Sequence, residues 1–512
     1  MGIHNLLPFV KNACRQGNVG EFAGCSVAVD VSCLLHRGLF GCMESVAQGK
    51  KTNFYIHYVS KHIKALLDVG CHVIMVFDGR PLPAKKNTND ERRQRRADNV
   101  KAAELLLSEG KVSEAADKFR RATSITSEIV ESTIEHFRTY KNVDILVSPY
   151  ESDAQLAFLV NEGFADVVIT EDSDLIAFGC EKIAFKWSWE TGECTIYEKK
   201  ELPRCFSGAM SSQFDFTKFR RICILSGCDY LQAGLPGIGL NKALSFFSKT
   251  SRTDLRTLLP RIPNYLNMSK LTVSKEFIEE FIRAENTFMY QVIFDPRQRC
   301  QRPLTPYPCP QKEKSLDEND DDDDFVRPNK GKNSSDYSYA GEVLSSNLAV
   351  RLALGNQIEN SVIADKFFLP SPIPEWSVWC DKYESCGKQK RRLEEEHKRE
   401  EKKCGSAFRF DSPSKKRAKL DVTIDLIDLE QEDDLKSLQS SSPGEIVQPP
   451  DLRCDVSSKE KQGNLRNLAT RPKSLKNEAD PTWTVDAMMK MYGSEENSSI
   501  ANAAAASEFR VL

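Results

Sequence analysis

The chain has 512 residues, and its 71 lysines and arginines against 74 aspartates and glutamates give a formal net charge of −3. This balance does not exclude a nucleic-acid partner, because basic clusters in the body offset acidic runs nearer the end. The 16 cysteines include no CxxC pair, which argues against a cysteine-based zinc site and favours a reducing compartment. We expect no signal peptide and no membrane-spanning segment.

Strand and helix patterns alternate through the first part of the chain. Apolar runs predict strands, and apolar residues at helical spacing predict helices. The strands are expected at 25–30, 72–77, 143–147 and 166–170, and the helices at 55–69 and 153–162. Such alternation is typical of an α/β fold with a mostly parallel central sheet flanked by helices. Between the second and third strands, a long charged stretch from Pro83 to about Thr139 predicts two or three helices. Connections this long are usually functional.

Carboxylates follow four of the apolar runs, and an acidic pair lies where an irregular stretch passes into a helix. The seven acids are Asp30, Asp78, Glu151, Asp153, Asp172, Asp174 and Asp229. Because the carboxyl ends of parallel strands form one crevice, acids from distant stretches can converge there. Like charges raise each other's pKa until something compensates them, and hard oxygen ligands point to a pair of Mg²⁺ or Mn²⁺ ions. The alternative is that each acid only caps the next helix.

A basic cluster opens the charged stretch directly after Asp78. It comprises Lys85, Lys86, Arg92, Arg93, Arg95 and Arg96. Two or more cations on each successive helical turn suit phosphates approached from one side. The alternative is a solvated helix face whose charge is balanced by neighbouring acids.

A glycine-rich turn lies between two helical patterns beyond Asp229. In Gly237-Ile238-Gly239, backbone N–H groups unobstructed by side chains can receive a phosphate at a helix N-terminus, and Lys242 follows one turn on. An ordinary turn is the alternative. Beside an acidic site, the pattern predicts a helix-hairpin-helix type of element that grips a duplex backbone without reading bases.

Several blocks of the sequence resemble the flap endonuclease and exonuclease 1 superfamily of 5′ nucleases, in family order. They are MGIHNLLP, VFDGRPLPAKK, PYESDAQLAFL, ITEDSDLIAFG and LSGCDYL with GIGLNKA. Three further blocks, LLSEGKVSEAADKF, FIRAENTFMYQVIFDP and YAGEVLSSNLAVRLALGN, are similar to the eukaryotic exonuclease 1 branch and extend the resemblance to about residue 357.

The resemblance implies a division of the chain into six regions. They are an N-terminal nuclease region (1–99), a helical arch (80–140), an internal nuclease region (138–230), a helix-two-turn-helix element with following helices (226–300), an acidic linker and packing extension (301–358) and a mostly disordered regulatory tail (359–512).

The resemblance also implies an activity: 5′-to-3′ exonuclease action on double-stranded DNA and cutting of 5′ flaps, in mismatch repair and double-strand-break end resection. The seven acids would hold two Mg²⁺ ions roughly 4 Å apart, with Mn²⁺ able to substitute, for in-line attack on a phosphodiester. The residues given catalytic roles are Asp78, Asp172 and the arch-base cations Lys85 and Arg92. The residues expected to contact DNA are Gly2, His36, Arg93, Arg95, Arg96, Gly237, Ile238, Gly239 and Lys242.

Two departures from the family pattern bear on substrate binding. Ser32 stands where relatives often have an aromatic residue that stacks on a base. The approach YLQAGLPGIG is one residue longer than usual, which bears on the monovalent cation expected at the helix-two-turn-helix element. The alternatives left open are a replication-type flap endonuclease, a non-catalytic DNA-binding repair scaffold and a structure-specific RNase with the same core.

The last part of the chain carries three short motifs. SPSKKRAKLD (412–421) predicts nuclear import, with a solvated charge run as the alternative. Alternating apolar and acidic residues over 422–430 could add a strand to SUMO, and PTWTVDAMMKMYG could dock as a short helix on a mismatch-repair protein. An inert remnant is the alternative for the latter. We expect a nuclear monomer whose substrates are duplex DNA with 5′ ends, nicks, gaps or flaps.

Overall fold

The fold is taken from a computed structural model. It describes residues 2–47, 52–231, 234–308, 336–359 and 362–393. The three motifs predicted beyond residue 411 lie outside these ranges. None of the described helices is both long and apolar enough to cross a membrane.

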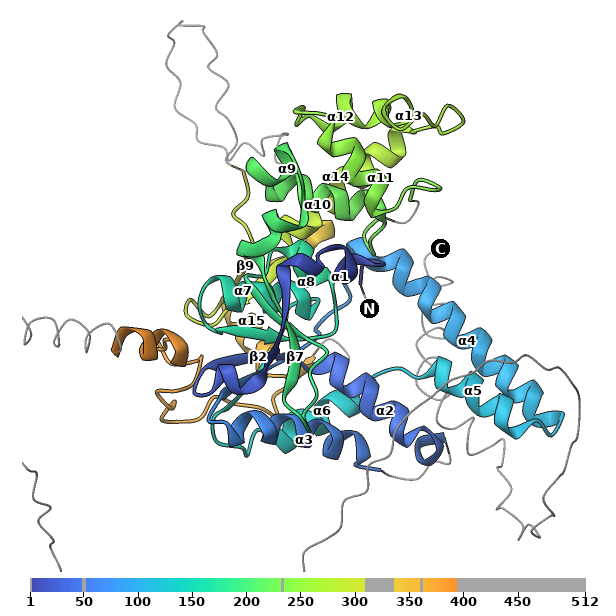
Figure 1. The fold of residues 1–512 in the computed structure, drawn as a ribbon. Coiled ribbons are helices and arrows are strands. Elements are labelled where there is room, and N and C mark those ends of the chain that lie inside the picture. Colours follow the sequence, from blue (N-terminus) through green and yellow to red (C-terminus); the bar gives the residue numbers. More distant parts are fainter. Residues whose placement is uncertain (1, 48–51, 232–233, 309–335, 360–361, 394–512) are drawn as a thin grey trace, which may run out of the picture. The chain divides into compact units, whose positions relative to one another are not determined.

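A central sheet, with β2 and β7 labelled in Figure 1, forms the core. Its seven strands follow the order β1-β7-β6-β5-β2-β3-β4. Neighbouring strands from β6 to β4 are parallel, and β7 pairs antiparallel with both β6 and β1. The strands are β1 (Cys14–Asn18), β2 (Ser26–Asp30), β3 (His72–Phe77), β4 (Val143–Val147), β5 (Val167–Ile169), β6 (Lys182–Phe185) and β7 (Glu193–Glu198). Every residue of β2 and β3 is buried, as expected for parallel strands covered on both faces. The predicted α/β fold with a mostly parallel sheet is confirmed.

Helices flank this sheet, and α7 packs on β2, β3 and β5. They include α1 (Leu6–Phe9), α2 (Val31–Ala47), α3 (Phe54–Asp68), α7 (Ser152–Asn161), α8 (Asp174–Phe178) and α9 (Ala209–Ser212). The helices predicted at 55–69 and 153–162 correspond to α3 and α7. Helix α2 was not predicted because it begins directly after β2, with no turn residue between the two elements.

The apolar run before Asp229 is a helix, so treating it like the strands that precede the other acids was wrong. It forms α10 (Phe216–Ser226), which starts where the Asp215 side chain accepts a hydrogen bond from the Thr217 N–H at 2.8 Å. The run is uniformly apolar because this turn of α10 is buried on all sides, and periodicity alone does not separate a short buried helix from a strand.

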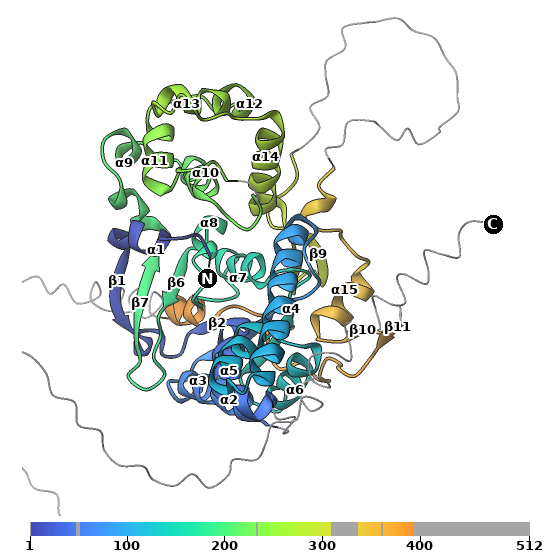
Figure 2. The ribbon, with the colours of Figure 1, turned by 90° about the vertical axis from the view of Figure 1, so that its right-hand side faces the viewer.

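The charged stretch forms a helical hairpin followed by a helix that returns to the core. A 3-10 turn, η3 (Pro83–Lys85), leads into α4 (Lys86–Ser108), which packs on α5 (Val112–Ala122) (Figure 2). The hairpin has its own small apolar cluster of Ala103, Ala115 and Phe119. Next, α6 (Ser127–Phe137) buries its last turn in the main core.

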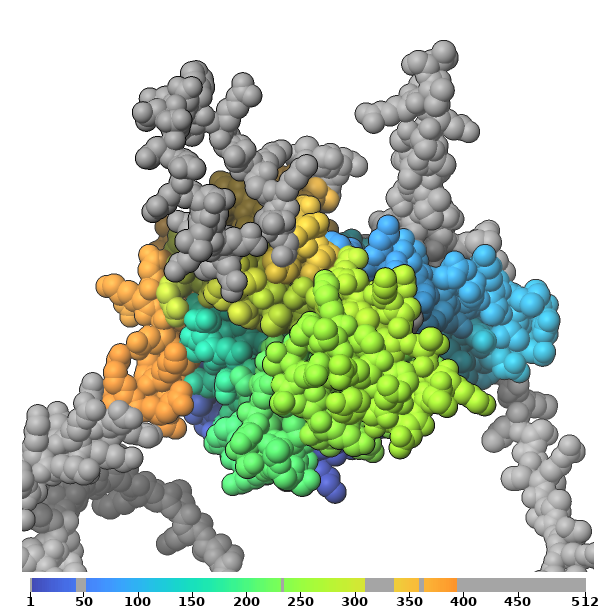
Figure 3. Space-filling model, turned by 90° about the horizontal axis from the view of Figure 1, so that it is seen from above, coloured from blue at the N-terminus to red at the C-terminus, as the bar shows by residue number. Residues whose placement is uncertain are grey.

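Beyond α10, the chain forms a helical part that occupies one contiguous block in Figure 3. It contains α11 (Leu240–Ser248), α12 (Leu255–Leu258), α13 (Ile262–Tyr265) and α14 (Lys275–Tyr290), followed by the hairpin of β8 (Val292–Asp295) and β9 (Cys300–Pro303). The Gln155 side chain on α7 ties this hairpin to the core, because it both donates to and accepts from the Phe294 backbone at 2.8 Å.

The folded part extends past residue 358, where the tail was predicted to begin. After the 3-10 turn η6 (Ser338–Ala340) come α15 (Ser346–Ala353), β10 (Gln357–Glu359) and β11 (Val362–Ala364). Residues 376–387, here called the strap, then bury Val378, Trp379 and Tyr383. The prediction was wrong for this segment because average composition does not show that a few of its apolar side chains, such as Trp379 and Tyr383, are buried in the core.

The strap lies at the amino ends of the strands, opposite the ends that carry the predicted acids. Buried Asp144 of β4 accepts hydrogen bonds from the Ser377 hydroxyl at 2.6 Å and the Val378 N–H at 2.7 Å. The Tyr383 hydroxyl donates to the Ser26 hydroxyl at 2.9 Å or to the Phe164 carbonyl at 2.8 Å. These contacts join the strap to the amino ends of β2 and β4, which lie more than two hundred residues earlier in the chain.

Candidate active site

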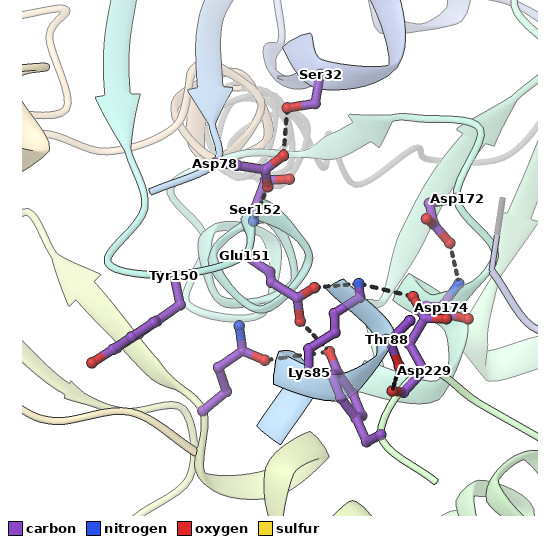
Figure 4. Close-up of polar contacts among 12 residues, drawn as sticks. Ser32, Asp78, Lys85, Thr88, Tyr150, Glu151, Ser152, Asp172, Asp174 and Asp229 are labelled. Atoms are coloured by element: carbon purple, nitrogen blue, oxygen red, sulfur yellow. Dashed lines mark hydrogen bonds and ion pairs between the residues drawn. The ribbon is translucent and has the colours of Figure 1, made fainter. Parts of the chain in front are cut away.

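The predicted acids do come from one edge of the sheet. Asp30 ends β2, Asp78 follows β3, and Asp172 and Asp174 follow β5, the three strands being neighbours in the order β5-β2-β3. Glu151 and Asp153 stand at the first turn of α7, and Asp229 follows α10. Figure 4 shows Asp78, Glu151, Asp172, Asp174 and Asp229 around the side chain of Lys85.

Asp30 and Asp78 are held by donors from neighbouring elements. Asp30 accepts from the Thr170 hydroxyl at 2.7 Å and from the Cys33 thiol at 2.9 Å. Asp78 accepts from the Ser32 hydroxyl at 2.7 Å and from the Ser152 N–H at 2.8 Å. Ser32, which departs from the family's aromatic residue, therefore orients an acid of the site.

Lys85 is the central cation of the site. Its ammonium group donates to Glu151 and lies 2.9 Å from an oxygen of Asp229, and its side chain is only 13% exposed. Arg92 binds the same Asp229 oxygen at 2.8 Å, and Thr88 donates to the Asp229 carbonyl at 2.9 Å. The first turns of α4 are thereby joined to the segment after α10.

The amino-terminal residues form part of the wall of the site. The Ile3 N–H donates to Asp174 at 2.7 Å. A Cβ atom at Gly2, whose φ is +82°, would lie 2.3 Å from an Asp172 oxygen and 2.8 Å from an Asp174 oxygen. Glycine is required at position 2 both by this backbone conformation and by the lack of space for a side chain. The sequence predicts that Gly2 lies near the 5′ end of the substrate, and no larger residue fits there.

Crowding and burial change the protonation of these acids. Burial, reinforced by the charge of Asp78, raises the pKa of Asp30 to about 6. Burial and the neighbouring Asp172 carboxylate raise the pKa of Asp153 and of Asp174 well above the usual range. For Asp229 burial also acts to raise the pKa, but Lys85 and Arg92 outweigh it and the pKa is lowered.

The donor set fits hard divalent cations. The acids offer oxygen ligands only, and burial together with neighbouring carboxylates raises the pKa of Asp30, Asp153 and Asp174, an arrangement that bound cations would relieve. Within the described ranges, no three acidic, histidine or cysteine side chains already converge on one point as they would around a bound ion. Several acids are turned instead toward Lys85 and the protein donors described above.

The other predicted DNA contacts before the glycine-rich turn lie on α2, which carries His36, and on α4, which carries Arg93, Arg95 and Arg96. His36 and Arg96 are half-buried, and His36 is close enough to Asp78, Arg92 and Arg96 for their charges to act on it. Burial lowers the pKa of His36. Arg93 and Arg95 are exposed and pair with acids of their own helix, Asp90 at 3.8 Å and Glu91 at 3.0 Å. The alternative, a solvated helix face whose charge is balanced by neighbouring acids, therefore describes Arg93 and Arg95.

The glycine-rich turn lies at the start of α11. Gly237 has a φ of +74°, and Gly239 is the residue directly before the helix. Ile238 is buried, whereas Lys242 is exposed with its ammonium 3.7 Å from the Met268 sulfur. The longer approach to this turn includes residues 232 and 233, which lie outside the described ranges.

Sequence reasoning did not identify several residues that orient the acids. Tyr230 is buried and donates to Glu151 at 2.6 Å, while Thr170 and Cys33 hold Asp30. Each of the three lies within three residues of a predicted acid in the sequence, and this closeness was the one sign that it could belong to the site. Adjacency alone, however, does not show which hydroxyl points into the site.

We expect Mg²⁺ to stabilise the protein more at pH 7.5 than at pH 5. When folding raises the pKa of a carboxyl group, that group stabilises the folded state at pH values below its pKa in the unfolded chain. The stabilisation is lost as the pH rises through the pKa in the folded state, which is about 6 for Asp30. Mg²⁺ requires the deprotonated acids, so it restores stability in that same upper window. Thermal melts with MgCl₂ or with NaCl of equal ionic strength test this. A Mg²⁺-induced rise in Tm that is the same at both pH values would contradict it.

Comparison with known families places this site. An XPG N-terminal domain matches residues 1–99 and an XPG I-region matches residues 142–229, and together they contain all seven acids. The chain therefore carries both an XPG N-terminal domain and an XPG I-region.

Relatives in other organisms show which family the chain belongs to. The chain is 40% identical over 392 residues to exonuclease 1 of Danio rerio, covering 75% of this chain and 45% of the relative. It is 41% identical over 357 residues to exonuclease 1 of Drosophila melanogaster, covering 70% and 46%. It is 30% identical to the DNA damage-inducible protein DIN7 of Saccharomyces cerevisiae, covering 58% of this chain and 67% of the relative. The chain belongs to the exonuclease 1 family, and it spans about half the length of the exonuclease 1 relatives.

Solved structures with partial similarity include two DNA complexes. The catalytic core of Rad2 in complex with DNA substrate has a TM-score of 0.41 at 19% identity, covering 56% of this chain and 86% of that one. The Holliday junction-resolving enzyme GEN1 in complex with product DNA and Mg²⁺ ion has a TM-score of 0.38 at 19% identity, covering 56% and 64%.

Proposed function

We propose that the protein is a divalent-metal-dependent 5′-to-3′ exonuclease of double-stranded DNA with 5′-flap endonuclease activity. The observation that carries this is the clustering of acids from β2, β3, β5, α7 and the segment after α10, with the largely buried Lys85 bound to two of them, Glu151 and Asp229. A scaffold that only binds DNA has no evident need for so many crowded carboxylates, which burial and mutual repulsion make costly.

Two Mg²⁺ ions, or Mn²⁺ in their place, would be held by the seven acids. When bound, the ions supply a nucleophile at neutral pH and offset negative charge on the phosphodiester. The side chains around the acids would bind and orient the substrate. Lys85 and Arg92 place positive charge beside the acids at the base of the arch, where a scissile phosphate needs electrostatic stabilisation. Gly2 lets the amino-terminal backbone lie directly against Asp172 and Asp174.

Substrate binding is assigned to the arch and to the glycine-rich turn. Arg93, Arg95 and Arg96 would attract the phosphate backbone without reading sequence. Backbone N–H groups at Gly237–Gly239, with Lys242, would hold a duplex phosphate together with a monovalent cation. Backbone contacts of this type suit an enzyme that acts at 5′ ends, nicks, gaps and flaps of any sequence.

The cellular setting is also part of the proposal. By resemblance to exonuclease 1, the protein would act in mismatch repair and in the resection of broken ends, and the motif at 412–421 would direct it to the nucleus. The protein would act as a monomer, with SUMO bound through 422–430 and a mismatch-repair protein bound through the motif near residue 485.

The experiment that tests the proposal is digestion by the full chain of a 5′-recessed duplex and a 5′-flap duplex, each labelled at the 3′ end. We expect successive shortening from the 5′ end and release of the flap in Mg²⁺, and neither in EDTA. An RNA duplex of the same sequence is the matched substrate control. DNA binding without cleavage would favour the repair scaffold, flap cutting without exonuclease products would favour a replication-type flap endonuclease, and equal cleavage of RNA would favour an RNase.

A further inference from the structure

A contact chain links the extension after residue 335 to two acids of the site. Its central member is Tyr150, which is 4% exposed and directly precedes Glu151. The Tyr150 hydroxyl accepts hydrogen bonds from the Glu342 N–H at 2.8 Å and from the Arg80 guanidinium at 3.0 Å. The guanidinium carbon lies 4.7 Å from the centroid of the Tyr150 ring. Tyr150 and Arg80, which contact each other, therefore both meet a segment about two hundred residues or more further along the chain.

The extension fits closely against this tyrosine. Gly341 has a φ of +113°, and a Cβ atom there would lie 2.4 Å from a carbon of the Tyr150 ring. Neighbouring Ala340, at the end of η6, is fully buried. The extension thus reaches Tyr150 in a conformation and at a distance that only glycine permits.

Behind Tyr150, the loops that carry Asp78 and Glu151 are hydrogen-bonded to each other. The Gly79 N–H donates to the Tyr150 carbonyl at 2.6 Å, and the Arg80 N–H donates to the Pro149 carbonyl at 3.2 Å. The Ser152 N–H closes the set by donating to Asp78 at 2.8 Å. The spacing of Asp78 from Glu151 is therefore set by the same backbone that Tyr150 and Arg80 hold in place.

We propose that Tyr150, Arg80 and Gly341 are positioning residues for the metal site, through which the extension holds Asp78 and Glu151 at their working separation. None of the three needs to touch substrate or metal. The inference rests on the proposed function, since it names what sets the geometry of that same site. Partners that orient metal ligands from outside typically change metal affinity by roughly 10- to 100-fold when they are removed.

The test compares Tyr150→Phe with Tyr339→Phe. Both substitutions remove a hydroxyl from a partly or fully buried tyrosine, but the Tyr339 hydroxyl accepts from Asn286 at 3.0 Å and has no described contact with Tyr150. The first readout is the Mg²⁺ concentration that gives half of the maximal Mg²⁺-induced rise in Tm, without DNA. The second readout is the Mg²⁺ concentration for half-maximal cleavage.

We expect Tyr150→Phe to raise both concentrations by roughly tenfold, and Tyr339→Phe to leave them as in the wild type. DNA binding in EDTA should be equal in the two variants. Gly341→Ala, which drives a methyl group into the Tyr150 ring, should act in the same direction as Tyr150→Phe. Equal Mg²⁺ requirements in the wild type and in Tyr150→Phe would overturn the inference. A wild type that shows the Mg²⁺-dependent rise in Tm but no cleavage would overturn the proposed function alone, because the first readout needs no activity.

Discussion

If the proposed function holds, Asp172→Asn is expected to reduce phosphodiester cleavage by roughly a thousandfold, because the loss of one proposed metal ligand would remove about 4 kcal/mol of transition-state stabilisation. The fold should survive, since the remaining amide oxygen can still accept from the Asp174 N–H, which donates to Asp172 at 3.0 Å. In the absence of Mg²⁺ the variant should be at least as stable as the wild type, because burial and crowding raise the pKa of Asp172 and one crowded charge is removed.

Single-turnover cleavage and thermal melting, each with and without Mg²⁺, measure these effects. Asp68→Asn, at an exposed position at the end of α3, is the matched control and should leave both unchanged. Cleavage by Asp172→Asn within tenfold of the wild type would remove this acid from the proposed ligand set. A loss of cleavage accompanied by a fall in Tm without Mg²⁺ would indicate a structural role instead.

Ending the chain at residue 360 is expected to prevent stable folding, whereas ending it at residue 393 is not. The shorter fragment loses the strap and with it the buried Trp379 and Tyr383 side chains. Loss of a large buried aromatic costs about 3–5 kcal/mol, and each buried polar group left unpaired costs about 1–3 kcal/mol. Asp144 would lose its Ser377 and Val378 donors. These losses are comparable to the whole stability of a typical domain, roughly 5–15 kcal/mol.

Circular dichroism melts of fragments 1–360 and 1–393 test this prediction. The longer fragment keeps all the contacts described for the strap and should melt cooperatively. The shorter one should aggregate, or melt without a cooperative transition. If 1–360 instead melted within a few degrees of 1–393, the strap would be a surface addition and not part of the fold.

The sequence predicted the acidic edge because each of those acids closely follows an apolar run or opens a helix. In parallel sheets, strand ends meet at one edge, so local patterns at Asp30, Asp78 and Asp172 were enough to bring together residues far apart in the chain. The same reasoning failed for the run before Asp229, since a fully buried helical turn and a buried strand have the same apolar composition.

What the sequence did not predict depends on contacts over long separations. The Tyr150–Gly341 contact and the strap on Asp144 join segments about two hundred residues apart or more. No local period or motif reports such pairs. The pairing of Lys85 with Glu151 and Asp229 is of the same kind. The family resemblance predicted that Lys85 lies at the base of the arch, but it did not predict that Lys85 pairs with Glu151 and Asp229.

The separate apolar cluster of Ala103, Ala115 and Phe119 gives the α4–α5 hairpin a stability of its own. We expect the far half of the hairpin, which meets the core through contacts of α5 with α2, to open locally more readily than the sheet and its acidic edge. The near half has no such freedom, because Lys85, Thr88 and Arg92 bind Glu151 and Asp229. We therefore expect any opening of the hairpin to begin beyond these anchors, which would leave the residues at the acidic edge in place.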